Sequence, residues 1–98
     1  IQIPKEETGA QSVYHIYTIR TGSRDTLFKK LREQGVDARV YYSIPLHLQK
    51  GLAHLGYKKG DMRIAEDVIP SMISLPLYPE LTAKEQNKII ECIIGTLT

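Results

Sequence analysis

One histidine stands where the chain leaves a strand-like run and enters a turn. The run from Val40 to Ile44 is followed at once by Pro45, and His47 comes two positions later. Proline fixes its own φ and has no backbone donor, so a strand must end there. Loops at strand ends often carry binding and catalytic side chains. An imidazole at this corner can donate a hydrogen bond or move a proton near neutral pH. The alternative is a histidine that caps the next helix or bonds a backbone carbonyl.

Two adjacent tyrosines precede this corner. Tyr41 and Tyr42 lie at the end of the predicted strand, and each phenol can donate a hydrogen bond. Neighbouring side chains of a strand point to opposite faces, so we expect only one of the two to face a cleft. The alternative for each is half-buried packing on a sheet. Tyr41, Tyr42 and His47 are the candidate site residues.

Other reactive side chains carry weaker signals. Cys92 is the single cysteine, so it forms no internal disulfide, and its isoleucine neighbours predict a buried, inert thiol. His15 and His54 follow no metal-ligand spacing, so we expect no metal site. No glycine-rich phosphate loop is present, and we assign no catalytic or cofactor-binding residue.

The elements that must position these side chains follow from apolar periodicity. Residues 12–20 predict a strand with bulky groups on both faces. Residues 24–34 predict a helix, with Ser23 as its N-cap and Gly35 as its left-handed C-terminal cap. Residues 36–42 predict a second strand, which Pro45 breaks.

The second half of the chain predicts mostly helix. We expect short helices over residues 46–55 and 62–70, the latter capped by Asp61, and a third strand over residues 72–75. Thr82 and Glu85 form a capping box that opens the last helix. An apolar stripe predicts that this helix packs on the sheet. The stripe consists of Ile89, Ile90, Ile93, Ile94 and Leu97.

This order of elements predicts one small α+β domain. The domain has two layers, with about three strands and with the helices mostly on one face. A chain of 98 residues has room for a single modest core. We interpret residues 1–11 as a connector and residues 12–98 as the domain.

Charge and targeting signals exclude several classes of protein. The net charge of +2, from 13 basic and 11 acidic residues, is too mild to indicate nucleic acid or an anionic membrane as partner. The chain shows no signal peptide and no long apolar run, and a single cysteine favours a reducing, cytoplasmic setting. The chain begins with Ile1, which fits a fragment of a longer polypeptide or a chain whose start was removed.

Four segments together resemble one enzyme family. They are Pro45-Leu46-His47 with Gln49, Gly56-Tyr57 with Gly60-Asp61, Ala65-Glu66, and Ser74-Leu75-Pro76 with Tyr78-Pro79 and Leu81-Thr82. From about residue 13 to residue 97 the chain resembles the C-terminal part of the DegT/DnrJ/StrS family. These are pyridoxal-phosphate (PLP) dependent aminotransferases that act on nucleotide-linked keto-sugars.

The resemblance implies the small domain of a fold-type-I aminotransferase. Its parent would move an amino group from glutamate to a nucleotide-linked keto-sugar, and this domain would form one wall of the substrate cleft. His47, Tyr42 and Tyr41 would bind substrate, although Tyr41 stands where the family has a histidine. The resemblance also implies PLP in the parent, a large N-terminal PLP-binding domain and a homodimer.

The chain lacks the parts that hold PLP in the family. PLP enzymes use a lysine that forms a Schiff base with the cofactor, and no lysine here follows the family's serine and aromatic motif. The eight lysines are Lys5, Lys29, Lys30, Lys50, Lys58, Lys59, Lys84 and Lys88. We expect the chain alone to bind no cofactor and to be inactive. The rival hypothesis is a free-standing, non-catalytic α+β binding or regulatory module, which the upstream coding sequence would distinguish.

Overall fold

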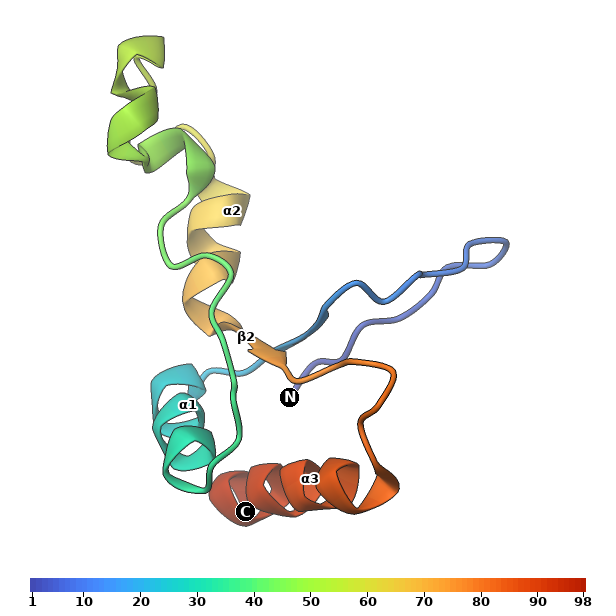
Figure 1. Cartoon of the computed structure of the whole chain (residues 1–98). Coiled ribbons are helices and arrows are strands. Elements are labelled where there is room, and N and C mark those ends of the chain that lie inside the picture. The colour runs from blue at the N-terminus through green and yellow to red at the C-terminus, as the bar shows by residue number, and fades with distance from the viewer.

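The structure, a computed structural model, describes all 98 residues and is elongated. Its radius of gyration is 15.6 Å, against about 13 Å for a compact chain of 100 residues. Two segments project from a small core, as Figure 1 shows. One is an N-terminal loop, residues 1–16, and the other is a helical arm, residues 41–71, drawn in green and yellow. Most residues of these two segments are exposed.

The sheet consists of two antiparallel strands, β1 (Tyr17–Arg20) and β2 (Met72–Leu75). Tyr17 pairs with Leu75 and Arg20 pairs with Met72. The strand predicted over residues 12–20 is therefore wrong in its first half. The reason lies in the partner strand: Pro76 follows Leu75 and has no N–H group with which to extend the ladder.

The second predicted strand, residues 36–42, is reduced to one bridge. Arg39 and Ser74 exchange two backbone hydrogen bonds of 2.9 and 2.8 Å. Before the bridge, the Ala38 N–H bonds the carbonyl of Val36 at 2.9 Å, which turns the backbone. After the bridge, the chain leaves the sheet and enters the arm (Figure 1). The two strands, with this bridge and a second one between Gln2 and Arg20, still confirm the α+β class.

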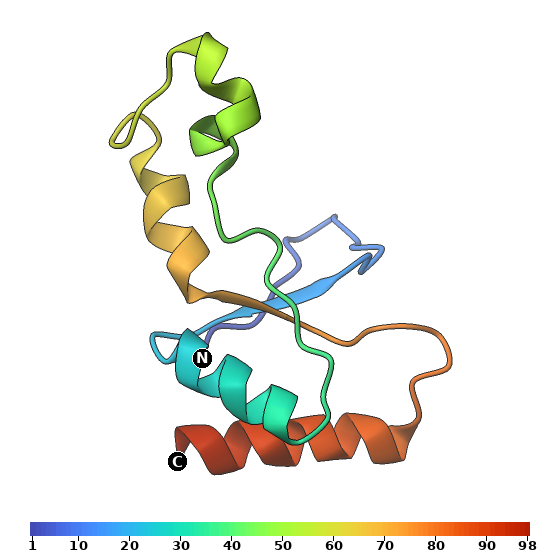
Figure 2. The same ribbon diagram turned by 60° about the vertical axis from the view of Figure 1, so that its left-hand side comes forward.

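Two helices, α1 (Arg24–Glu33) and α3 (Ala83–Leu97), form the second layer on one side of the sheet. Figure 2 shows them together, on the side of the strands opposite to the arm. The core lies between the layers, where burial of apolar side chains supplies the main stabilisation. It contains Ile19, Leu27, Leu31, Val36, Ala38, Ile73, Ile89 and Ile93.

The ends of α1 and α3 can be compared with the predicted caps. Gly35 has φ +76°, in the left-handed region that favours glycine, so the predicted end of α1 is confirmed. Ser23 occupies the N-cap position of α1 but makes no side-chain capping bond, so that part of the prediction is wrong. The capping box of α3 is confirmed: the Glu85 N–H donates to the Thr82 hydroxyl and the Thr82 N–H donates to the Glu85 carboxylate.

Helix α3 buries a narrower stripe than predicted. Ile89 and Ile93 are buried, whereas Ile90 is 44% exposed and Ile94 is 56% exposed. The prediction was wrong for this second pair because the sheet and α1 contact only one side of the helix. Cys92 is half-buried instead of buried.

The arm contains two 3₁₀ helices, η1 (Leu46–Leu48) and η2 (Lys50–Leu55), then α2 (Arg63–Val68) and the 3₁₀ turn η3 (Ile69–Ser71). The helix predicted over residues 46–55 is split because Gln49 has an extended conformation, with ψ 133°.

The cap predicted for the second helix of the arm is wrong. Met62 is the N-cap of α2, while the Asp61 carboxylate accepts from the Lys58 N–H at 2.9 Å. No helix of the structure is both long and apolar enough to cross a membrane.

Candidate functional site

His47 lies in η1, the first helical turn of the arm. Pro45 is the N-cap of this turn, and its carbonyl accepts from the Leu48 N–H at 2.9 Å. The Gln49 side chain donates to the carbonyl of Ile44 at 3.1 Å, which ties the two ends of the turn together. The Pro-Leu-His-x-Gln segment therefore folds as one local unit that fixes the backbone of His47.

The imidazole of His47 is held by a carboxylate from another element. Its Nε2 atom lies 2.8 Å from Oε1 of Glu66, which belongs to α2. The two side chains are 8% and 14% exposed. This contact joins η1 to α2, so it fixes the geometry of the arm as well as the ring.

Glu66 is itself held by backbone donors. The Gly60 N–H lies 2.9 Å from each carboxylate oxygen, and the Met62 N–H lies 3.4 Å from Oε1. The hydrogen bond from His47 is the main cause that holds the pKa of the Glu66 carboxyl below its usual value. Desolvation opposes it, and the two backbone donors act in the same direction as His47. Gly60 reaches this position with φ +96°, which favours glycine. The carboxylate is therefore ionised at neutral pH.

A tyrosine supports the other side of the histidine. The rings of His47 and Tyr57 lie edge to face, with centroids 6.4 Å apart and planes at 89°. The imidazole thus has a hydrogen bond at one nitrogen and an aromatic contact on the ring. Such an arrangement presents the remaining nitrogen, Nδ1, in a defined orientation.

The two predicted tyrosines lie apart from this cluster. The rings of Tyr41 and Tyr42 pack against each other, with centroids 5.5 Å apart and planes at 66°. The expectation that they point to opposite faces is wrong, because this segment is not a strand. No hydrogen bond or ring contact joins either tyrosine to His47. The structure places the three candidate residues on one arm without bringing them into one contact cluster.

Tyr41 lines a cavity of about 240 Å³ at the end of the sheet. Asp37 and Arg39 also line it, together with the corner formed by residues 76–78. Arg39 donates to the Asp37 carboxylate at 2.9 Å, and Arg32 donates to it from α1. These contacts, that of Arg39 first, hold the pKa of Asp37 below its usual value. Asp37 is therefore shared between two guanidinium groups, and this group of three charges carries a net positive charge at the cavity.

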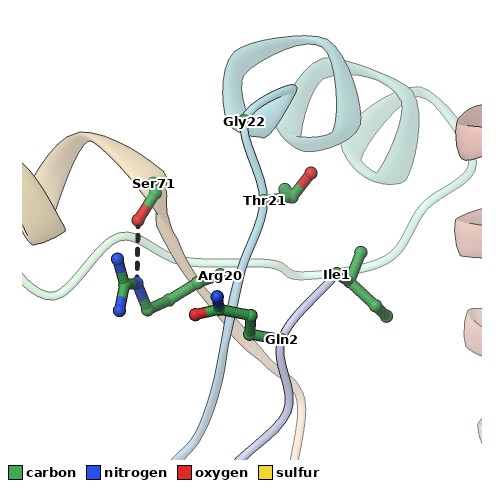
Figure 3. A pocket seen from close by; sticks show the side chains of 6 residues that line it. All are labelled: Ile1, Gln2, Arg20, Thr21, Gly22 and Ser71. Atoms are coloured by element: carbon green, nitrogen blue, oxygen red, sulfur yellow. Dashed lines mark hydrogen bonds between the residues drawn. The ribbon is translucent and has the colours of Figure 1, made fainter.

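A second hollow, of about 290 Å³, lies where the N-terminal segment pairs with the end of β1 through Gln2 and Arg20 (Figure 3). The Arg20 Nε donates to the Ser71 hydroxyl at 3.1 Å across it. Gln2, Thr21 and Gly22 complete its polar wall. It contains none of the candidate residues.

The comparison with known families tests the resemblance that the motifs suggested. The sequence model of the DegT/DnrJ/EryC1/StrS aminotransferase family matches residues 1–94. The chain belongs to this family. The resemblance inferred from the motifs is thereby confirmed.

Relatives within the family are much longer than this chain. A protein of Geobacillus stearothermophilus named "Pleiotropic regulatory protein" is 47% identical over 92% of the chain and 24% of its own length. The dTDP-3-amino-3,4,6-trideoxy-α-D-glucose transaminase of Micromonospora megalomicea subsp. nigra is 30% identical over 100% of the chain and 26% of its own length. The chain thus spans about a quarter of the curated relatives it matches.

A solved structure of the family carries the same fold. The chain superimposes with a TM-score of 0.90 on S. venezuelae DesV in complex with a ketimine intermediate, at 28% sequence identity. The match covers 96% of this chain and 25% of that one. The projecting arm and loop therefore belong to the fold of the family.

The residues of this chain do not themselves fit a PLP site. All eight lysines are exposed, and the three that line hollows, Lys30, Lys84 and Lys88, lie on the solvent-exposed faces of α1 and α3. No step through the cofactor can be assigned to these residues.

The Pro-Leu-His motif indicated His47 but gave no indication of Glu66, its hydrogen-bond partner. In the sequence, Glu66 was noted only as part of the family segment Ala65-Glu66, and no role was assigned to it. A local signal was present, since a glutamate in the first turn of a helix can accept from backbone N–H groups at its start.

Proposed function

We propose that this chain is the C-terminal domain of a PLP-dependent aminotransferase that moves an amino group from glutamate to a nucleotide-linked keto-sugar. The observation that carries the proposal is the family match over residues 1–94. The relative from Micromonospora is named as a transaminase of a dTDP-linked amino sugar, which supports a nucleotide-linked sugar as substrate.

The arm forms one wall of the substrate cleft in this proposal. His47, Tyr41 and Tyr42 are its substrate-binding residues. His47 suits the role because its ring is oriented by Glu66 and Tyr57. Tyr42 suits it because its side chain is 71% exposed and its hydroxyl has no partner within the chain. A preoriented ring and a free phenol can recognise sugar hydroxyl groups by hydrogen bonding.

The Schiff-base lysine and the phosphate-binding groups come from a large N-terminal domain in this proposal, and PLP supplies the electron sink for transamination when bound there. Exposed apolar side chains support docking of the arm against that domain or a partner subunit of a homodimer. Those of the arm are Tyr41, Tyr42, Ile44, Leu46, Leu55, Tyr57, Met62 and Ile64.

The test is an aminotransferase assay on the full-length protein. It is purified with PLP and mixed with glutamate and a dTDP-linked 3-keto-sugar. We expect 2-oxoglutarate and the amino sugar in equal amounts, and little product when aspartate replaces glutamate. Absence of turnover with both dTDP-linked and UDP-linked 3-keto-sugars would contradict the proposal.

One observation favours a second candidate, a non-catalytic regulatory module. The relative from Geobacillus stearothermophilus, at 47% identity, is named as a regulatory protein. The same assay separates the two candidates. A regulatory module has no turnover, and its full-length protein carries no lysine that borohydride links to PLP.

A further inference from the structure

We propose that Glu66 is a positioning residue that holds His47 as the tautomer protonated on Nε2, so that Nδ1 is the ring atom that accepts a hydrogen bond from the sugar substrate. This inference rests on the proposed function, in which His47 faces the substrate. It adds that Nδ1 of His47 is the atom that binds the substrate and that Glu66 is the residue that fixes the tautomer.

The argument begins with the chemistry of the two groups. A neutral imidazole carries its proton on one nitrogen and accepts with the other. An ionised carboxylate can only accept. Because Oε1 of Glu66 lies 2.8 Å from Nε2 of His47, Nε2 must be the donor. In the neutral ring, Nδ1 is then the acceptor.

Backbone donors hold the carboxylate of Glu66 in place and keep it as the acceptor. The Gly60 N–H binds both of its oxygens at 2.9 Å, and the Met62 N–H adds a longer contact to Oε1. These donors favour the ionised form of Glu66 and fix its plane. The loop that contains Gly60 thus acts through Glu66 on the ring of His47.

Nδ1 is left available by the same arrangement. The bond to Glu66 is the only hydrogen bond of the His47 side chain. Nδ1 is not among the buried unpaired atoms of the chain, so it reaches the surface although the side chain is only 8% exposed. An acceptor at the surface of a mostly buried, oriented ring is suited to a hydroxyl or amino group of a sugar.

The competing role for His47 is purely structural, a link that ties η1 to α2 through Nε2. The two roles use different atoms, so two substitutions separate them. The amide of glutamine can take the place of Nε2 and can keep the link to Glu66. The amide of asparagine can take the place of Nδ1 but is too short to reach Glu66.

The experiment compares His47→Asn and His47→Gln in the full-length enzyme, with His54→Asn as a control on an exposed histidine of η2. We expect His47→Gln to lower kcat/KM for the keto-sugar by at least about 10-fold, and His47→Asn to retain more activity than His47→Gln. Activity of His47→Gln equal to or above that of His47→Asn overturns the inference.

¹⁵N NMR measures directly which ring nitrogen of His47 carries the proton. In enzyme labelled with ¹⁵N-histidine at about pH 9, where histidine rings are ordinarily neutral, the signals lost in His47→Asn identify the ring. We expect a protonated Nε2 and an unprotonated Nδ1, and a shift towards the other tautomer in Glu66→Gln. A proton on Nδ1 in the wild-type enzyme overturns the assignment.

The two proposals fail in different ways. If His47→Ala, His47→Gln and His47→Asn all keep full activity, His47 does not serve the substrate and the proposed site is wrong. If His47→Ala is impaired but His47→Gln is not, the site stands and the tautomer inference fails.

Discussion

The Nε2 atom of His47 lies 2.8 Å from the Oε1 atom of Glu66, although 19 positions separate the two residues along the chain. This contact joins the first turn of the arm to its α-helix. It makes the geometry of the candidate site depend on one ionised carboxylate, and this dependence can be measured.

Acid should weaken the contacts that Glu66 makes within the arm. The pKa of Glu66 is lower in the folded chain than its ordinary value of 4.5, so its ionised form stabilises the fold. That contribution is fully present above the ordinary value and is lost as pH falls through the lower, folded value. We expect protection of the Gly60 amide from hydrogen exchange, corrected for the intrinsic rate, to fall below about pH 4.5.

The matched variant for this measurement is Glu66→Gln, which keeps the shape of the side chain and removes its charge. Its Gly60 amide should show weaker protection at neutral pH and no loss on acidification. A Gly60 amide with the same pH profile in both proteins would show that Glu66 does not hold the loop.

The caps of the two long helices should respond differently to alanine. Thr82→Ala removes a formed capping box and should cost about 1 kcal/mol of unfolding free energy. Ser23→Ala removes a hydroxyl that makes no capping bond at the start of α1, so its cost should stay within about 0.5 kcal/mol. Urea denaturation of the 98-residue chain measures both. Equal costs would contradict the hydrogen bonding described for these caps.

Two isoleucines of α3 form a matched pair that tests the core. Ile93 is 8% exposed and Ile90 is 44% exposed. Ile93→Ala should cost about 2–5 kcal/mol of unfolding free energy, because it leaves a cavity between α3 and the rest of the core. Ile90→Ala should cost well under half of that. Similar urea midpoints for the two variants would mean that α3 packs in another orientation.

The chain alone should not bind PLP at a single lysine. None of its lysines is buried, and none follows the serine and aromatic motif of the family's Schiff-base lysine. After mixing with PLP and reduction with borohydride, we expect only diffuse, substoichiometric labelling in peptide mass spectra. One dominant labelled lysine at a stoichiometry near one would contradict this expectation.

Two local sequence signals predicted helix ends correctly, whereas the caps predicted at Ser23 and Asp61 were wrong. The Thr82–Glu85 capping box and the Gly35 helix end need only a few consecutive residues, and both are present. The strands predicted over residues 12–20 and 36–42 were too long, because a strand also needs a partner, and Pro76 ends the partner strand.

Side-chain burial and contacts depend on the tertiary fold, which the sequence pattern does not reveal. Ile90 has the same residue type and periodicity as Ile93, and only the position of α1 and the sheet separates them. The Pro45-Leu46-His47 motif predicted His47 as a site residue. Its link to Glu66 could not be predicted, because α2 must first fold back along the arm.

The central claim is that His47 serves the sugar substrate of a longer aminotransferase. The most direct measurement is kcat/KM for the nucleotide-linked keto-sugar in the full-length enzyme, for the wild type and for His47→Ala. Loss of a hydrogen bond at the reacting sugar should lower this value by a factor of order 10², while His54→Ala, at an exposed position of the same arm, should leave it unchanged. An unimpaired kcat/KM in His47→Ala would contradict the account and would leave His47 as a structural link within the arm.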